Sequence, residues 1–250
     1  FITYIMQILM SLMMMSMIFI TLILSRASVE RIIEVFDEEV DVADNENGLT
    51  SVSDGSIEFK DVNFSYSKDK ENLTLENINL SIKSGETIGI IGGTGSSKTT
   101  LVQLIPRLYD VLSGEVLVGG KNVKEYTLDA LRNSVAMVLQ KNVLFSGTIK
   151  ENLKWGDENA TDEEIYEACK AAQAHDFIMS FPDGYDTDLG QGGVNVSGGQ
   201  KQRLCIARAL LKKPAIVILD DSTSAVDTAT DSKIRKAFRE KLADTTTIII

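Results

Sequence analysis

The segment GGTGSSKTT, Gly92 to Thr100, constrains the fold more than any other part of the sequence. It follows a short apolar run, ETIGIIGG, and it precedes KTTLVQLIPRLY, which has the composition of a helix. A glycine-rich turn between a strand and a helix is the setting in which backbone N–H groups surround phosphates. The sequence therefore predicts a phosphate-binding loop in an α/β fold. A glycine-rich turn that only caps an ordinary helix is the alternative.

Two side chains of this loop have predicted roles. We expect Lys98 to reach the β- and γ-phosphates of a nucleotide and the hydroxyl of Thr99 to coordinate Mg²⁺. The pattern G-x-x-x-x-G-K-[ST] is not met in full, because Ser97 replaces the glycine before the lysine. Serine there costs about 1–2 kcal/mol if the backbone is left-handed, and it is harmless if the backbone is already helical. The other residues expected to surround the phosphates are Gly92, Gly93, Thr94, Gly95, Ser96 and Thr100.

The N-terminal segment, residues 1–25, carries no charge and ends against Arg26. As a helix it would be about 37 Å long, enough to cross a hydrocarbon core of about 30 Å. It lacks the basic start and the small-residue cleavage site of a signal peptide, and a buried helix of a soluble protein is the other alternative. We expect residues 1–25 to be the C-terminal part of a transmembrane helix that ends in the cytoplasm. We also expect the chain to be a piece of a longer protein.

The negative charge is concentrated next to that segment. Nine acidic and two basic residues lie between Arg26 and Gly55, and the whole chain has a formal net charge of −11. Residues 56–250 are therefore nearly neutral and lack the basic stripe of a nucleic-acid-binding protein. Residues 26–55 are expected to form an intracellular helix extension and an acidic linker. The two cysteines, Cys169 and Cys205, have no metal-binding spacing, which favours a reduced cytosolic compartment.

From Ile57 onward, strands alternate with helices. The predicted strands include residues 57–64, the buried run AIVILD and the final TTTIII, and helices are predicted over residues 161–181, from Ser197, and at about 229–242. Thr161 and Glu164 form a capping box at the start of one of these helices. This alternation predicts a mainly parallel α/β core.

A second glycine-containing helix start lies at VNVSGGQKQR. Ser197 and Gln200 form another capping box there. Gly198 and Gly199 cost about 1 kcal/mol each relative to alanine in a first turn, so helix stability gives no reason for them. They are understandable if a bulky anion approaches the backbone N–H groups at the positive helix end. A cap without a further role is the simpler alternative.

The phosphate loop, the S-G-G-Q-x-Q-R helix and a buried strand ending in aspartate together resemble the nucleotide-binding domain of ATP-binding cassette (ABC) transporters over residues 56–250. The uncharged N-terminal segment and MVLQKNVLFSGTIKENL are similar to exporter-type half-transporters. The resemblance implies a P-loop domain with a RecA-like core, an antiparallel β subdomain and a helical signature subdomain, preceded by the end of one transmembrane helix. It also implies that ATP and Mg²⁺ are bound and that ATP drives efflux.

Further roles follow from this resemblance alone. Tyr66 would stack on adenine, Gln140 would contact Mg²⁺ and sense the transmembrane domain, and Asp220 would lie on the Mg²⁺ side. Residues 224–227 would cross a dimer interface. The lone His175 matches no catalytic position and is expected to be structural.

Asp221 stands where the family carries a glutamate that polarises the attacking water, so Asp221, Gln140 and Lys98 form the expected catalytic set. Such a base must lie within about 2.6–3.2 Å of the water. Aspartate is one methylene shorter, and a misplacement of about 1 Å costs about 10²-fold in rate. We expect this site to bind ATP well and to hydrolyse it slowly. Ser97 and Gln191, which stands where exporters carry a glutamate, also depart from the family pattern.

Cassettes of this family dimerise head to tail, so the resemblance implies a second half-transporter subunit. The simplest hypothesis is a heterodimer whose other cassette carries the glutamate, with Ser197, Gly198, Gly199 and Gln200 completing the partner's site. The membrane and a transported small molecule, lipid or peptide are the other expected partners, and no nucleic acid is expected. A soluble ABC ATPase without transport and a non-hydrolysing regulatory subunit are the alternatives.

Overall fold

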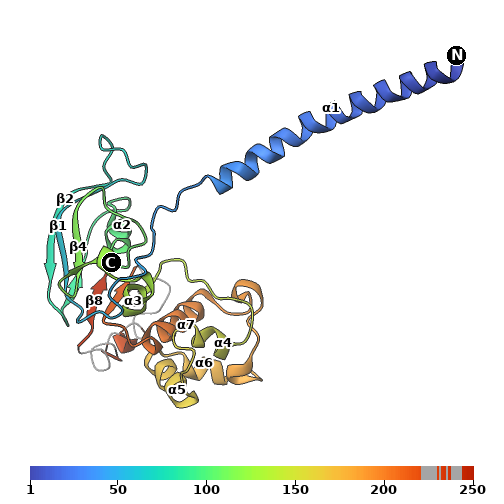
Figure 1. Cartoon of the computed structure of the whole chain (residues 1–250). Coiled ribbons are helices and arrows are strands. Elements are labelled where there is room, and N and C mark those ends of the chain that lie inside the picture. Colours follow the sequence, from blue (N-terminus) through green and yellow to red (C-terminus); the bar gives the residue numbers. More distant parts are fainter. Residues whose placement is uncertain (221–229, 231, 235, 238–243) are drawn as a thin grey trace. The chain divides into compact units, whose positions relative to one another are not determined.

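In a computed structural model the chain separates into two compact units, Phe1–Ala43 and Asp44–Ile250 (Figure 1). The structure describes residues 1–220, 230, 232–234, 236–237 and 244–250. The division between the units falls before Gly55, the expected end of the acidic linker.

The first unit contains one long helix, α1 (Ile2–Phe36), and none of its residues is buried. The helix runs unbroken from the uncharged segment through Arg26, as the helical spacing of ASVERIIEVF predicts. By length and composition α1 could cross a membrane, although core helices of soluble proteins and signal sequences meet the same criterion. A helix that is apolar on all sides needs an apolar environment around it.

The second unit is built on two sheets, which confirms the expected fold class. The antiparallel sheet has the order β2-β1-β4-β5 and contains β1 (Ile57–Phe64), β2 (Leu75–Ile82), β4 (Ser113–Val118) and β5 (Lys121–Asn122). The parallel sheet has the order β3-β8-β7-β6 and contains β3 (Thr87–Gly89), β6 (Val135–Val138), β7 (Ile216–Leu219) and β8 (Thr246–Ile249).

Strand β7 shows how the core is arranged. All four of its residues are buried. Ile216 and Ile218 belong to the cluster shared with the antiparallel sheet, whereas Val217 and Leu219 belong to the cluster that contains the later helices. Because successive strand residues point to opposite faces, this short strand joins the two apolar cores, as expected for a parallel strand covered on both sides.

The helices of the second unit are short, and α4 to α7 gather beside the parallel sheet (Figure 1). They are α2 (Lys98–Gln103), α3 (Leu128–Ser134), α4 (Ile149–Lys154), α5 (Asp162–Ala171), α6 (His175–Met179) and α7 (Gly198–Leu211). The described residues also include three 3₁₀ helices: η1 (Val123–Glu125), η2 (Gly184–Asp186) and η3 (Gln191–Gly193). The capping boxes predicted at Thr161 and Ser197 are confirmed.

Two predicted helices differ from the structure. The helix after the phosphate loop ends at Gln103 instead of continuing to Tyr109, because Pro106 disfavours helix before it and Arg107 has a φ of 51°. The helical region 161–181 is divided into α5 and α6, since Gln173 adopts a left-handed conformation with φ 56°. The helix predicted at about 229–242 lies mostly outside the described residues.

Residues 44–55, which we call the strap, lie along the second unit. Leu49 accepts a hydrogen bond from the N–H of Thr127 (3.0 Å), and its own N–H donates to the carbonyl of Glu125 (2.8 Å). At the other end, the carbonyl of Gly55 accepts a hydrogen bond from the Thr246 hydroxyl at 2.6 Å. The strap is therefore a structural part of this unit, although the sequence predicts it as linker.

Candidate nucleotide site

The candidate site lies where the parallel strands β3, β6 and β7 end. Open α/β sheets bind ligands at the carboxyl ends of their strands, because loops with free polar groups meet there. The phosphate loop follows β3, Gln140 follows β6, and Asp220 follows β7. A pocket of about 580 Å³ at this edge is lined by Tyr66, Thr74, Thr94, Gly95, Ser96, Ser97, Lys98, Thr99, Thr100, Gln140, Asp220 and Ile250.

The phosphate loop is closed around the ammonium of Lys98. Its Nζ donates hydrogen bonds to the carbonyls of Gly92 and Gly93, both at 2.8 Å, and to the hydroxyl of Ser96 at 3.2 Å. A Cβ atom at Gly93 or Gly95 would meet no other atom within 4 Å, so the space beside these glycines is open. The loop therefore combines a cation with an open backbone surface, as binding of a polyphosphate requires.

Ser97 occupies a left-handed conformation, with φ 59° and ψ 21°. Of the two cases that the sequence allowed, this is the unfavourable one, because a non-glycine residue in this region costs about 1–2 kcal/mol. Ser97 is also the N-cap of α2, but its side chain makes no capping hydrogen bond. The serine is therefore strained without the usual compensation at a helix start.

The two residues predicted on the Mg²⁺ side are adjacent in space. The Thr99 hydroxyl donates a hydrogen bond of 2.8 Å to Oδ2 of Asp220. Asp220 is only 6% exposed. A hydroxyl and a carboxylate are hard oxygen donors, and Mg²⁺ commonly takes one or two such protein groups together with phosphate oxygens. The described residues contain no group of three or more His, Cys, Asp or Glu side chains that could hold a metal. The pair thus fits a metal that arrives with a nucleotide.

Tyr66 and Gln140 complete the wall of the pocket. Tyr66 is 52% exposed, and its hydroxyl lies 3.0 Å from the hydroxyl of Thr100. An exposed aromatic ring whose hydroxyl is hydrogen-bonded is suited to stacking against a flat base. Sequence reasoning did not single out two further lining residues, Thr74 and Ile250, because neither falls in a recognisable motif.

The signature residues are held at the start of α7 and do not line this pocket. The Ser197 N–H donates to Oε1 of Gln200 at 2.8 Å, and the Gln200 N–H donates to the Ser197 hydroxyl at 3.3 Å. A Cβ atom at Gly198 would meet nothing within 4 Å, so this helix start is open. Asp221 and residues 224–227 lie outside the described residues.

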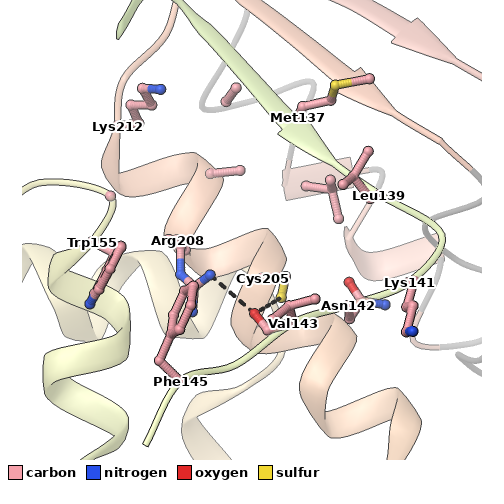
Figure 2. A pocket seen from close by; sticks show the side chains of 14 residues that line it. Met137, Leu139, Lys141, Asn142, Val143, Phe145, Trp155, Cys205, Arg208 and Lys212 are labelled. Carbon is pink, nitrogen blue, oxygen red and sulfur yellow. Dashed lines mark hydrogen bonds between the residues drawn. The ribbon is translucent and has the colours of Figure 1, made fainter. Parts of the chain in front are cut away.

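A second, smaller hollow of about 260 Å³ is lined by residues on both sides of Gln140 in the sequence, among them Leu139, Lys141 and Val143 (Figure 2). On its wall, Arg208 Nη1 (3.3 Å) and Cys205 Sγ (3.8 Å) donate to the carbonyl of Val143, and Phe145 stacks on Trp155. Burial raises the pKa of the Cys205 thiol. These contacts fix the segment after Gln140 against α7, the helix that begins with the signature residues.

Residues 75–224 of the chain match the family model described as "ABC transporter". The chain belongs to the ABC transporter family. It is 47% identical over 231 residues to the "Putative multidrug export ATP-binding/permease protein YgaD" of Bacillus subtilis (strain 168), covering 92% of this chain and 40% of that protein. The "Putative multidrug export ATP-binding/permease protein SACOL1924" of Staphylococcus aureus (strain COL) is 47% identical over 223 residues, covering 88% of this chain and 38% of that protein.

Among solved structures, this ABC transporter domain is similar to a bacterial Atm1-family ABC exporter with ATP bound. The TM-score is 0.84 at 34% sequence identity, over 94% of this chain and 41% of that one. The chain thus spans about 40% of the length of the relatives that it matches. The fold expected from the resemblance, a nucleotide-binding domain with an N-terminal helix, is confirmed.

Proposed function

We propose that this chain is the ATP-binding part of an ABC exporter subunit, which couples ATP binding and hydrolysis to efflux across the cell membrane. The observation that carries the proposal is the 2.8 Å contact between Thr99 and Asp220, in the same pocket as Lys98 and Gln140. The similarity to multidrug export proteins supports export as the process. The transported compound is a small molecule, a lipid or a peptide.

The side chains divide the binding of Mg²⁺·ATP between them. Lys98 compensates the charge of the β- and γ-phosphates, Thr99 and Asp220 offer oxygen ligands to the metal, and Tyr66 supports the adenine. Gln140 contacts the metal from the end of β6 and, through the segment packed on α7, connects the site to other parts of the transporter. Helix α1 is the end of the last transmembrane helix, and the nucleotide-binding domain is cytoplasmic.

The chain's own site hydrolyses ATP slowly in this proposal, because Asp221 replaces the longer glutamate. Ser97 supports the same conclusion, since a serine with a left-handed backbone stands where the phosphate-loop pattern has glycine. The partner is a second half-transporter whose cassette carries glutamate, and Ser197, Gly198 and Gly199 complete the partner's site. The open start of α7 supports this role, because these residues do not line the chain's own pocket.

The first experiment measures binding of Mg²⁺·ATP to the full chain in detergent. We expect Lys98→Ala and Asp220→Asn each to weaken binding by at least 10-fold, because they remove a phosphate contact and a metal ligand. Glu163→Gln, a change of an exposed carboxylate outside the pocket, is the matched control. Unchanged binding in Lys98→Ala and Asp220→Asn would contradict the assignment of the site.

The second experiment measures ATP turnover with and without the partner subunit. Turnover is expected only with the partner, and Asp221→Glu is expected to raise the rate contributed by this chain's site by 10-fold or more. Rapid turnover by this chain alone would contradict the heterodimer. An unchanged rate in Asp221→Glu would show that the length of Asp221 does not limit hydrolysis.

A further inference from the structure

The hydroxyl of Tyr66 contacts the helix that begins in the phosphate loop. Its oxygen lies 3.0 Å from Oγ1 of Thr100, the third residue of α2. We propose that Thr100 is a positioning residue for the nucleotide base: its hydroxyl holds the Tyr66 ring and so links base recognition to the phosphate loop. This inference rests on the proposed function, in which the ring supports adenine.

The two partners of this contact differ in burial. Thr100 is 7% exposed, whereas Tyr66 is 52% exposed. The polar end of the tyrosine is therefore fixed at a buried hydroxyl, while much of its ring remains accessible from the pocket. A side chain with a free ring and a fixed hydroxyl is suited to present one constant surface to a ligand.

The donor and acceptor capacities of the three side chains are compatible with the contact to Thr100. The Tyr66 hydroxyl has one hydrogen, and Oε1 of Gln103 is a second acceptor at 3.4 Å. When Tyr66 donates to Gln103, the Thr100 hydroxyl can donate to Tyr66, so both contacts can exist together. The shorter contact is the one to Thr100, and hydrogen bonds between hydroxyls weaken beyond about 3.0 Å.

Two aromatic neighbours fix the rest of the ring. Phe64, at the end of β1, lies 4.9 Å away between centroids at an interplanar angle of 81°, and Tyr109 lies 5.1 Å away at 90°. Near-perpendicular pairs at such distances are favourable aromatic contacts. Ring orientation is thus set from β1, from α2 and from the turn after α2.

The consequence concerns the two ends of a nucleotide. Lys98 and Thr99, the first two residues of α2, bind the phosphates. Thr100, the next residue of the same helix, positions the Tyr66 ring that contacts the base. Ordering these groups before the ligand arrives removes part of the cost of binding. Loss of one such hydrogen bond is expected to weaken ATP binding about 3- to 10-fold.

The test compares Mg²⁺·ATP with Mg²⁺·tripolyphosphate, which lacks the base and ribose, by calorimetric titration of the full chain in detergent. Tyr66→Phe should weaken ATP binding 3- to 10-fold and leave tripolyphosphate binding unchanged. Thr100 also lines the pocket beside the phosphate loop, so Thr100→Val should weaken ATP binding at least 3-fold and tripolyphosphate binding by less. The losses in the double variant should be less than additive, because both substitutions remove the hydrogen bond between the two hydroxyls. Thr100→Ser, which keeps the hydroxyl, should restore ATP binding and also guards against a folding defect in Thr100→Val.

Three results would overturn the inference. ATP affinity unchanged in Tyr66→Phe would show that the hydroxyl does not position the ring. Equal losses for ATP and tripolyphosphate in Thr100→Val would assign Thr100 to direct phosphate contact, and strictly additive losses would show that the two hydroxyls act separately. If Lys98→Ala abolishes binding of both ligands while Tyr66→Phe changes neither, only the positioning role fails. If the wild type binds neither ligand, the proposed function fails with it.

Discussion

Ser97 is the residue at which the phosphate loop carries a cost in backbone energy. Its φ of 59° places a side chain where glycine would be unstrained. Ser97→Gly is expected to raise the free energy of unfolding by about 0.5–1 kcal/mol, because the relief of left-handed strain exceeds the extra entropy of glycine in the unfolded chain. Urea unfolding of the full chain in detergent measures this difference.

The neighbouring serine provides the control for this prediction. Ser96→Gly makes the same chemical change, but Ser96 has no positive φ, and its hydroxyl donates a 2.8 Å hydrogen bond to the carbonyl of Gly93. We expect Ser96→Gly to lower the free energy of unfolding. A stabilisation of equal size in both variants would show that the effect does not come from the left-handed backbone.

The same residues show what the sequence could predict about the site. The spacing of Lys98 and Thr99 after a strand predicted a phosphate loop, and the structure places both residues in one pocket with Asp220. The sequence allows either a left-handed or a helical φ at Ser97, since a dihedral angle depends on the surrounding loop and not on residue type alone. The contact between Tyr66 and Thr100 could not be predicted either, because it joins side chains far apart in the sequence.

At the scale of elements, one ion pair connects the start of α5 with the end of α7. Lys213 Nζ lies 2.6 Å from Oε1 of Glu164, and this hydrogen bond, with others from Thr161, lowers the pKa of Glu164 from 4.5 to about 2. A carboxylate whose pKa is lower in the folded state stabilises the fold above its unfolded pKa. That contribution is lost as the pH falls from about 4.5 through about 2.

Glu164→Gln is therefore expected to lower the melting temperature of the chain at pH 6, and the difference from wild type should shrink towards pH 3. The reason is that the glutamine side chain of this variant carries no charge to pair with Lys213 at any pH. Glu163→Gln is the matched control, since no ion pair joins Glu163 to another residue in the described part of the chain. A difference independent of pH would contradict the ionic origin of the effect.

Element boundaries followed the sequence where a local signal existed. The strand at residues 57–64 and both capping boxes were predicted correctly, because apolar alternation and S/T-x-x-E/Q patterns are local. The division between α5 and α6 was missed, since Gln173 is neither glycine nor proline. Its carbonyl accepts a 2.6 Å hydrogen bond from Arg203 of α7, a tertiary contact that supports the left-handed turn.

At the scale of the second unit, the strap shows why a polar segment can be structural. Its contacts are hydrogen bonds from polar side chains and from the backbone, together with close approaches at glycine, and these leave no apolar periodicity in the sequence. Leu49 pairs with the chain at Glu125 and Thr127, whereas Gly55 contacts Thr246 of β8. The strap therefore connects the end of the antiparallel sheet with the parallel sheet.

Two glycines of the strap allow this connection to be tested. A Cβ atom at Gly48 would lie 2.7 Å from the backbone nitrogen of Thr127, and one at Gly55 would lie 2.5 Å from the carbonyl oxygen of Ala215. Neither glycine has a positive φ, so alanine is resisted by contact alone. Gly48→Ala and Gly55→Ala are each expected to lower the free energy of unfolding by about 1–3 kcal/mol, as overpacking against backbone does.

Gly89→Ala is the control, because a Cβ atom at Gly89 would meet nothing within 4 Å and its φ is not positive. It should change the free energy of unfolding by less than about 0.5 kcal/mol. If the strap joins both sheets in one cooperative unit, both strap variants should lower the urea midpoint without changing the slope of the transition. If residues 44–55 detach before the rest of the unit unfolds, a separate transition will appear at lower urea concentration. That result would show that the strap does not contribute to the global stability of the unit.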